Sequence, residues 1–266
     1  MKKKLLIFIS ILAIIFIIGL FSLWFMNRNK VAVLGYHNVY MNDYEYNGND
    51  PFMLKFEHFE AQLQYLKKHK YKTLTLDEYY CFKQKTCKQP QKSVLITFDD
   101  GFYFNYKYAF PLLKKYNMNA ALFVIGKNLE NGQPDDHDAY SFLSKEYLEK
   151  VKAEYLNISV ASHSYNLHGD IHIDMMDKDA IKNDFASMNE IINTKYFAYP
   201  FGIHNDLSKE VLKEENIRLA FGFGKDKQSK KAHRKSSIND DNYLIPRFNI
   251  YAKLPMWKFK LYLQLP

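Results

Sequence analysis

The chain has 266 residues, of which 47% are hydrophobic and 25% are charged. This apolar content is enough for a sizeable core, which excludes a disordered chain, and 10 glycines and 8 prolines are too few for a fibrous or low-complexity protein. The 37 basic and 29 acidic residues give a net charge of +8, which raises nucleic acid or another anionic surface as a partner.

The excess positive charge is concentrated at the N-terminus. Residues 1–30 hold five basic residues and no acidic one, whereas the chain from Val31 onward holds 32 basic and 29 acidic residues. Because the remainder is nearly neutral, we expect no nucleic-acid partner.

The uncharged stretch at 5–25 predicts a membrane anchor. Its 21 residues would span about 31 Å as a helix, which is the thickness of a bilayer core. The alternative is a signal peptide, but its apolar stretch is usually about 7–15 residues and ends in small residues, whereas residues 20–26 are mostly bulky. We therefore predict an anchor at 1–30, with its span at 5–25. The domain at 31–266 would then lie outside the cytoplasm, with the chain held in the cell membrane as a single-pass protein.

The two cysteines, Cys81 and Cys87, are close enough in the chain for a local disulfide in an oxidising compartment. Two free thiols are the alternative. A zinc site made of this pair alone would lack further ligands.

Short apolar runs alternate with longer amphipathic ones along the chain. Strands are predicted at 31–34, 94–97, 120–125, 158–161, 196–199, 218–221 and 243–245, with a weaker one at 71–76. Helices are predicted at 56–69, 106–116, 144–152, 178–193 and 207–215. This alternation predicts an α/β fold, and seven or eight such units fit a closed (β/α) barrel better than a doubly wound sheet.

Polar residues follow four of the predicted strands. In a parallel barrel the carboxyl ends of the strands share one face, so these clusters are expected to form one site. The four clusters are Gly35-Tyr36-His37-Asn38, Phe98-Asp99-Asp100-Gly101, the HSYNLH segment at 163–168, and Tyr199-Pro200-Phe201-Gly202.

Asp99 and Asp100 need a counter-ion if they are buried, because two adjacent carboxylates repel each other. A helix N-cap would explain one of them and leave its neighbour without a role. His163 and His168 are either ordinary loop histidines or, with Asp100, a set of two histidines and one carboxylate suited to zinc or another divalent ion. His172 could instead pair with His168, although the glycine between them disfavours a helix.

The TFDDG segment at 97–101 resembles the first motif of the polysaccharide deacetylases, the NodB-homology group of carbohydrate esterase family 4. The HS pair at 163–164 resembles their second motif and YPFG at 199–202 their third. The histidines five residues apart, GYHNV at 35–39 and IPR at 245–247 are similar to the circularly permuted poly-β-1,6-N-acetylglucosamine N-deacetylases of biofilms, the intercellular adhesion protein B subgroup. The resemblance covers nearly all of residues 31–250.

This resemblance implies a deformed NodB-type (β/α) barrel and a divalent metal ion, most often Zn²⁺. Asp100, His163 and His168 would hold the metal, and Asp99 would be the general base that deprotonates the attacking water. The resemblance also implies that His37 is the general acid and that the backbone N–H of Phe201 stabilises the oxyanion.

The sequence departs from the family at Ala198, where many members carry an arginine that orients the base aspartate. Arg247 either takes over this role or forms a surface salt bridge. Tyr165, Leu167 and Phe102 either line the acetyl pocket or pack in the core. The carboxylate that would pair with His37 is left open among three aspartates, Asp50, Asp170 and Asp174.

These observations predict a metal-dependent N-deacetylase that acts on N-acetylglucosamine residues of an extracellular polysaccharide, with poly-β-1,6-N-acetylglucosamine of biofilm as the leading substrate. One alternative is a peptidoglycan N-acetylglucosamine deacetylase of the cell wall. Another is a membrane-anchored glycan-binding module without catalysis, which the complete set of candidate catalytic residues disfavours.

Overall fold

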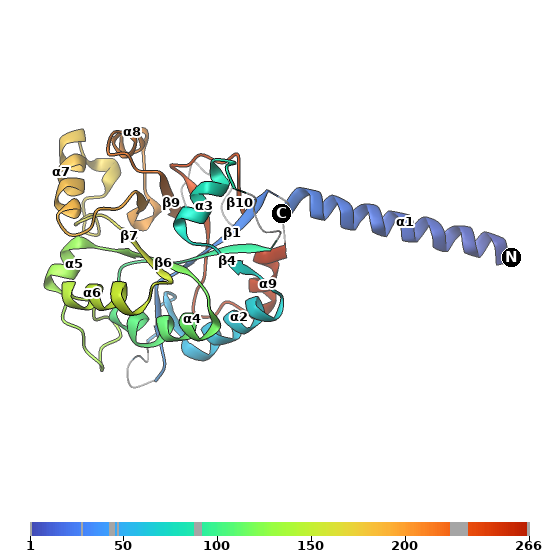
Figure 1. Cartoon of the computed structure of the whole chain (residues 1–266), viewed down its shortest axis with the longest axis horizontal. Helices are drawn as coiled ribbons and strands as arrows, with labels where there is room; N and C mark the ends of the chain where they lie inside the picture. Colours follow the sequence, from blue (N-terminus) through green and yellow to red (C-terminus); the bar gives the residue numbers. More distant parts are fainter. Residues whose placement is uncertain are drawn as a thin grey trace.

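A computed structural model describes residues 2–27, 29–42, 46, 48–87, 92–223 and 234–264 of the chain. Seven parallel strands form its centre (Figure 1). They are β1 (Lys30–Tyr36), β5 (Ser93–Phe98), β6 (Ala120–Val124), β7 (Ile158–Ser162), β8 (Tyr196–Ala198), β9 (Leu219–Phe223) and β11 (Ile245–Asn249).

The seven strands close into a barrel. Their order is β1-β11-β9-β8-β7-β6-β5, and β5 pairs back onto β1 over five residue pairs, from Ala32 with Val94 to Tyr36 with Phe98. The predicted α/β barrel is therefore confirmed. The parallel strand β4 (Lys72–Thr73) extends the sheet beside β5, and β10 (Ser236–Ser237) pairs antiparallel with the start of β1. A separate pair, β2 (Asn38–Tyr40) and β3 (Met53–Lys55), lies outside the barrel sheet.

Helices surround the strands (Figure 1). They are α2 (Phe56–Lys68), α3 (Leu76–Lys83), α4 (Phe110–Tyr116, preceded by the π-helical turn η1, Asn105–Ala109), α5 (Gly126–Asn131), α6 (Lys145–Glu154), α7 (Lys178–Asn189), α8 (Asp206–Glu214) and α9 (Met256–Gln264). The described residues also include two 3₁₀ turns, η2 (Ile173–Met175) and η3 (Pro200–Gly202).

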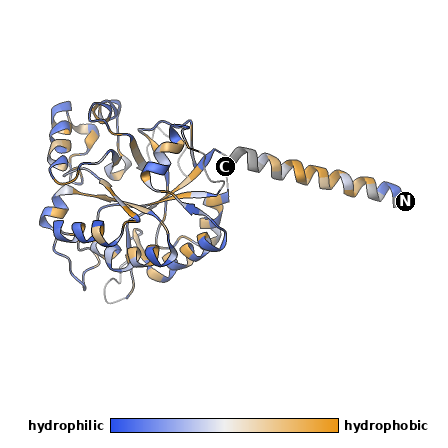
Figure 2. Cartoon of the chain, in the orientation of Figure 1, coloured by the Kyte–Doolittle hydropathy of each residue, from blue (hydrophilic) through white to orange (hydrophobic). Residues whose placement is uncertain are grey.

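The strands are buried on both faces, as their near-continuous apolar runs require. Alternate residues belong to different clusters: Val33 and Leu95 pack inside the barrel, whereas Leu34 and Ile96 pack under the helices. In Figure 2 these central strands are largely apolar, whereas the surrounding helices and loops mix polar and apolar residues. Side chains alternate along a strand, so residues an even number of positions after Val33 and Leu95 point to the inside of the barrel. Those that come after the end of a strand therefore point into the mouth of the barrel.

Five elements differ from the sequence predictions. Helix α3 replaces the end of the weak strand predicted at 71–76, because Thr75 and Glu78 form a capping box that starts a helix at Leu76. The last strand lies at Ile245–Asn249 instead of 243–245, and α7 ends at Asn189 instead of 193. Helices α5 and α9 were not predicted.

The N-terminal helix α1 (Lys2–Asn27) projects away from the barrel (Figure 1). Within the described part of the chain, no helix combines the length and the apolar character needed to cross a bilayer. The structure therefore gives no support to the predicted span at 5–25. A disulfide joins Cys81 in α3 to Cys87, which resolves the choice between a bond and two free thiols.

Candidate active site

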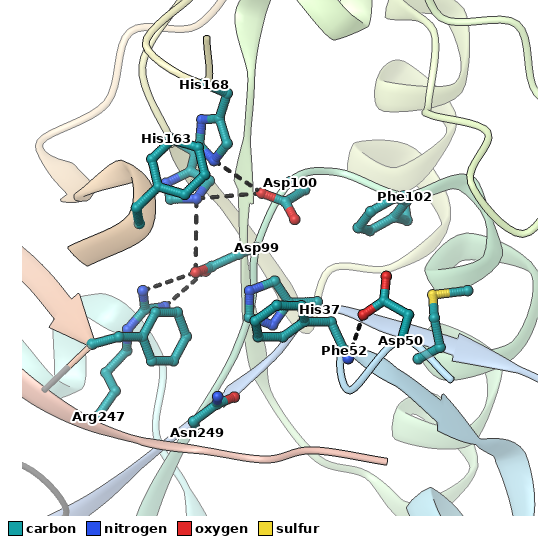
Figure 3. A pocket seen from close by; sticks show the side chains of 13 residues that line it. His37, Asp50, Phe52, Asp99, Asp100, Phe102, His163, His168, Arg247 and Asn249 are labelled. Atoms are coloured by element: carbon teal, nitrogen blue, oxygen red, sulfur yellow. Dashed lines mark hydrogen bonds and ion pairs between the residues drawn. The ribbon is translucent and has the colours of Figure 1, made fainter. Parts of the chain in front are cut away.

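A pocket of about 360 Å³ lies at the carboxyl ends of the barrel strands (Figure 3). Eight of the ten site residues predicted from the sequence line it: His37, Asp99, Asp100, Phe102, His163, His168, Phe201 and Arg247. The motifs that were scattered along the sequence thus meet at one place. Five further residues line the pocket: Asp50, Phe52, Met53, Phe223 and Asn249.

Asp99 and Arg247 form a fully buried ion pair at the bottom of the pocket. The Arg247 guanidinium donates two parallel hydrogen bonds to the carboxylate of Asp99, at 2.7 and 2.8 Å, and a third of 3.2 Å to the hydroxyl of Thr97. Both ionic side chains have no exposed surface. Arg247 is therefore not a surface residue, and the alternative of a surface salt bridge is wrong.

The environment of this pair controls the charge of Asp99. Burial raises the pKa of the Asp99 carboxyl, but the Arg247 guanidinium and His163 outweigh burial and hold the pKa below its ordinary value. The Arg247 guanidinium also lies 3.9 Å from the ring centroid of Phe223, which covers it. Asp99 is thus ionised and fixed in one orientation.

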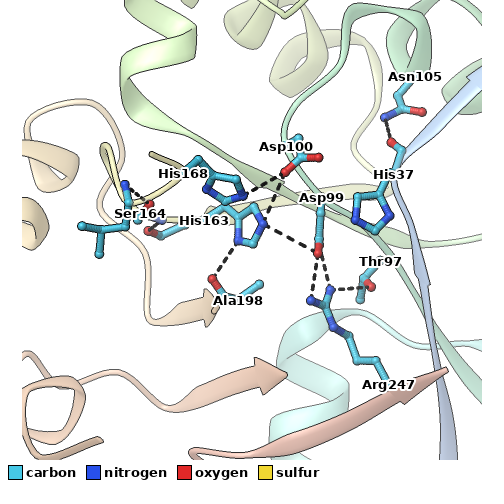
Figure 4. Close-up of polar contacts among 12 residues, drawn as sticks. His37, Thr97, Asp99, Asp100, Asn105, His163, Ser164, His168, Ala198 and Arg247 are labelled. Carbon is cyan, nitrogen blue, oxygen red and sulfur yellow. Dashed lines mark hydrogen bonds and ion pairs between the residues drawn. The ribbon is translucent and has the colours of Figure 1, made fainter. Parts of the chain in front are cut away.

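Asp100, His163 and His168 converge on a single point. One ligand atom from each lies within 4.8 Å of the others. The Asp100 Oδ1 atom is 3.4 Å from Nε2 of His163 and 3.3 Å from Nε2 of His168 (Figure 4). Two imidazole nitrogens and one carboxylate oxygen are a donor set that suits zinc and related divalent ions, so these residues fit a metal site.

The backbone directs these three side chains. Asp100 has a φ of +71°, which turns it away from the strand direction of β5 and separates its carboxylate from that of Asp99. The Nδ1 atom of His163 is 2.8 Å from the carbonyl oxygen of Ala198, which leaves its Nε2 facing Asp100. His172, the competing histidine, instead contacts the ring of Phe201 at a centroid distance of 5.0 Å.

The charges within this group affect one another. Burial raises the pKa of the Asp100 carboxyl, but hydrogen bonds from His163 and His168 hold that pKa well below its ordinary value. Burial and the neighbouring His163 lower the pKa of His168, whereas for His163 the carboxylates of Asp99 and Asp100 outweigh burial and raise the pKa.

His37 lines the same pocket, beside Asp99 in Figure 4. Its ring stacks on that of Phe223 at a centroid distance of 5.4 Å and contacts the tilted ring of Phe52 at 4.2 Å. Burial lowers the pKa of His37, and the carboxylates of Asp100 and Asp99 oppose this effect. Its Nδ1 atom is buried and lacks a hydrogen-bond partner among the described residues.

Of the three carboxylates considered as partners of His37, Asp50 lines the pocket, and Asp170 and Asp174 do not. The Asp50 carboxylate accepts a hydrogen bond of 2.8 Å from the backbone N–H of Phe52, the residue whose ring covers His37.

Phe201 lies at the rim of the pocket in the turn η3. Its φ is +57°, its side chain is half exposed, and its ring contacts that of His168 at a centroid distance of 4.9 Å. The next residue, Gly202, has a φ of +73°, and a Cβ atom there would lie 2.8 Å from the backbone N and O of Phe223. The turn therefore requires glycine at this position.

The three residues predicted to line an acetyl pocket have different positions. Phe102 lines the pocket and stacks on Phe142 at 4.9 Å. Leu167 is buried in the cluster between the barrel and helices α7 and α8, and the Tyr165 hydroxyl donates a hydrogen bond of 2.7 Å to Glu130. The prediction for Tyr165 and Leu167 does not fit these positions, because the loop directs both side chains away from the pocket.

Sequence reasoning missed four residues that line the pocket. They are Phe52, just before β3, Met53 in β3, Phe223 in β9 and Asn249 in β11. The first three are apolar residues that are typical of core positions. Asn249 carried a usable signal, because it lies two residues after Arg247 and therefore on the same face of β11.

The structure is a parallel barrel whose pocket holds a metal-type cluster, and the comparisons with known proteins identify its family. Residues 86–220 match the family model described as polysaccharide deacetylase. The poly-β-1,6-N-acetyl-D-glucosamine N-deacetylase of Staphylococcus epidermidis is 30% identical over 240 residues, which is 83% of this chain and 78% of that protein.

Two solved structures share the fold. The Streptococcus pyogenes deacetylase PplD, in complex with acetate, has a TM-score of 0.72 and 23% identity, with 89% of this chain and 99% of that chain covered. IcaB from Ammonifex degensii has a TM-score of 0.69 and 23% identity, with 89% and 97% covered. The chain belongs to the polysaccharide deacetylase family. It is an enzyme, a hydrolase of carbon–nitrogen bonds other than peptide bonds.

Proposed function

We propose that the protein removes acetyl groups from N-acetylglucosamine residues of an extracellular polysaccharide, with poly-β-1,6-N-acetylglucosamine as the substrate. The observation that carries this proposal is the meeting of an oriented, ionised Asp99, a metal-type cluster and His37 in one pocket. The choice of polymer rests on the Staphylococcus epidermidis relative and on the GYHNV and IPR segments at the two ends of the domain.

Asp100, His163 and His168 would hold the divalent ion, and zinc suits them because histidine nitrogens and a carboxylate oxygen are its usual ligands. When bound, such an ion acts as a Lewis acid that polarises the acetamide carbonyl and acidifies water.

Asp99 would accept the proton of the attacking water. Arg247 binds both carboxylate oxygens, so Asp99 stays ionised and cannot rotate away from the pocket. His37, which lines the same pocket, would donate a proton to the nitrogen of the departing sugar amine. The backbone N–H of Phe201 would donate a hydrogen bond to the oxyanion.

A location outside the cytoplasm is also part of the proposal, with residues 1–30 as the membrane anchor of the domain at 31–266. The 21 uncharged residues at 5–25, with lysines before them and Arg28 and Lys30 after them, support it. The disulfide between Cys81 and Cys87 is consistent with an oxidising compartment.

The test measures acetate release by zinc-loaded protein from β-1,6-linked N-acetylglucosamine oligomers, β-1,4-linked oligomers and peptidoglycan. We expect release from the β-1,6 oligomer to be fastest, and Asp99→Asn to reduce kcat by about 10²–10⁴-fold while glycan binding persists. Asp179→Asn, an exposed aspartate of α7, is the matched control and should retain full activity.

Two results would count against the proposal. Faster release from β-1,4 oligomers or peptidoglycan would favour the cell-wall alternative. Glycan binding by wild-type protein without any acetate release, whether zinc or cobalt is supplied, would favour a binding module instead of an enzyme.

A further inference from the structure

The loop between the two histidines of the metal-type cluster is held by side chains. It contains four residues, 164–167, and each of their backbone N–H groups donates to a side-chain oxygen. Ser164 donates to Ser162 Oγ (3.1 Å), Tyr165 to Asp184 Oδ1 (2.9 Å), Asn166 to Asp184 Oδ2 (2.8 Å) and Leu167 to Ser164 Oγ (3.1 Å).

This arrangement follows from the backbone of the loop. Ser164 has a φ of +74°, so the chain leaves the strand direction directly after His163 and does not form a helical turn. Without a helix or a strand, the N–H groups of the loop need acceptors other than backbone carbonyls, and side-chain oxygens can supply them. Asp184 supplies the acceptors for the two central N–H groups of the loop.

Asp184 lies on α7, in a position that is unusual for a carboxylate. Its neighbours Ile181, Phe185 and Met188 are buried in the core, and Asp184 itself is only 9% exposed. Burial raises the pKa of the Asp184 carboxyl, and the two backbone hydrogen bonds oppose that effect. A side chain as costly to bury as a carboxylate calls for a specific use, and its contacts are with the loop.

The two histidines depend on this loop to different degrees. His163 directly follows β7, its N–H donates to the carbonyl of Val124, and its ring is fixed by the carbonyl of Ala198. His168 comes after the loop, and its Nδ1 atom is buried without a hydrogen-bond partner among the described residues. Its ring contacts those of His163 and Phe201, but no described backbone carbonyl holds its Nδ1, so the position of His168 depends on the loop backbone more than that of His163 does.

We propose that Asp184 is a positioning residue for the metal site, which fixes the loop at 164–167 so that His168 meets His163 and Asp100. This inference rests on the proposed metal-dependent function. The carbonyl groups of Ser164 and Tyr165 are held from the other side by the backbone N–H groups of Gly126 and Lys127, at the start of α5. Loss of Asp184 should thus loosen the loop without unfolding it.

The experiment uses Asp184→Asn in the full chain. Asparagine keeps the size of the side chain but offers one acceptor oxygen, and its NH₂ group would face a backbone N–H. We expect zinc to bind about 10–100-fold more weakly, measured by competition with a chromophoric chelator, because groups that orient metal ligands have effects of this size. The absorption spectrum of the cobalt-loaded protein should also change, since it reports the ligand geometry.

Two further variants make the result specific. Asp179→Asn introduces the same chemical change on the same helix at an exposed position and should bind zinc like the wild type. Ser164→Ala removes the acceptor of the Leu167 N–H and should weaken zinc binding less than Asp184→Asn, which provides a second test if the latter variant folds poorly.

The outcomes separate the inference from the function on which it rests. If folded Asp184→Asn and Ser164→Ala bind zinc with the affinity and cobalt spectrum of Asp179→Asn, the positioning role is overturned. A loss of activity in Asp184→Asn with unchanged metal affinity would overturn it as well. If the wild type itself binds neither zinc nor cobalt, the proposed metal site fails and the inference fails with it.

Discussion

Replacement of Arg247 by methionine should strongly destabilise the barrel. Methionine fills much of the arginine volume, so the effect comes from the loss of charge and not from a cavity. The substitution removes two charge-assisted hydrogen bonds of 2.7 and 2.8 Å and leaves the Asp99 carboxylate with no exposed surface and without its main cation. Removal of one partner of such a buried pair costs about 3–5 kcal/mol, a large part of the roughly 5–15 kcal/mol that stabilises a typical domain.

Urea unfolding followed by circular dichroism, with a chelator present so that no metal ion compensates Asp99, measures this loss. The double variant Asp99→Asn/Arg247→Met removes both charges and should recover a substantial part of the lost stability. A loss below about 1 kcal/mol for Arg247→Met, or strictly additive effects in the double variant, would refute the view that Arg247 is needed to compensate a buried charge.

Three further predictions concern the metal, a turn and a buried lysine. Zinc at 100 times its Kd should stabilise the fold by about 2.7 kcal/mol and raise the Tm by several degrees, and an unchanged Tm would contradict the metal site. Gly202→Ala should lower the free energy of unfolding by about 1–3 kcal/mol, because its Cβ would meet the backbone of Phe223; a change under 0.5 kcal/mol in urea would contradict this reason. Burial lowers the pKa of Lys83 to about 8, below its value in the unfolded chain. Between pH 8 and 10.5 the unfolded state therefore binds more protons than the folded state. The stability of the wild type relative to Lys83→Met should thus rise over this range. Parallel stability curves over this range would disprove it.

Much of the barrel was predictable because its strands are short apolar runs. Six of the seven barrel strands overlap their predicted ranges closely, since a strand buried on both faces needs little more than a run of apolar residues. The site followed from the same pattern, because polar residues such as Asp99 and His163 come directly after such runs.

The parts that were missed depend on interactions between distant segments. The strand β11 contains Pro246 and Arg247, which interrupt its apolar pattern, and it exists because it pairs with β9 and β1. Arg247 is acceptable there because Asp99, at the end of β5 on the other side of β1, pairs with it. The start of α3 was readable from Thr75 and Glu78, whereas nothing in the HSYNLH segment indicated that Asp184 binds its backbone.

The pairing of β1 with both β5 and β11 has a consequence for the order of folding during synthesis. The strand that precedes His37 is among the first parts of the domain to leave the ribosome, and the strand that carries Arg247 is among the last. A nascent chain that has reached β9 therefore holds the Asp99 carboxylate without its cation and the β1 edge without one neighbour. Closure of the barrel and pairing of Asp99 with Arg247 should thus coincide, in a late step of folding.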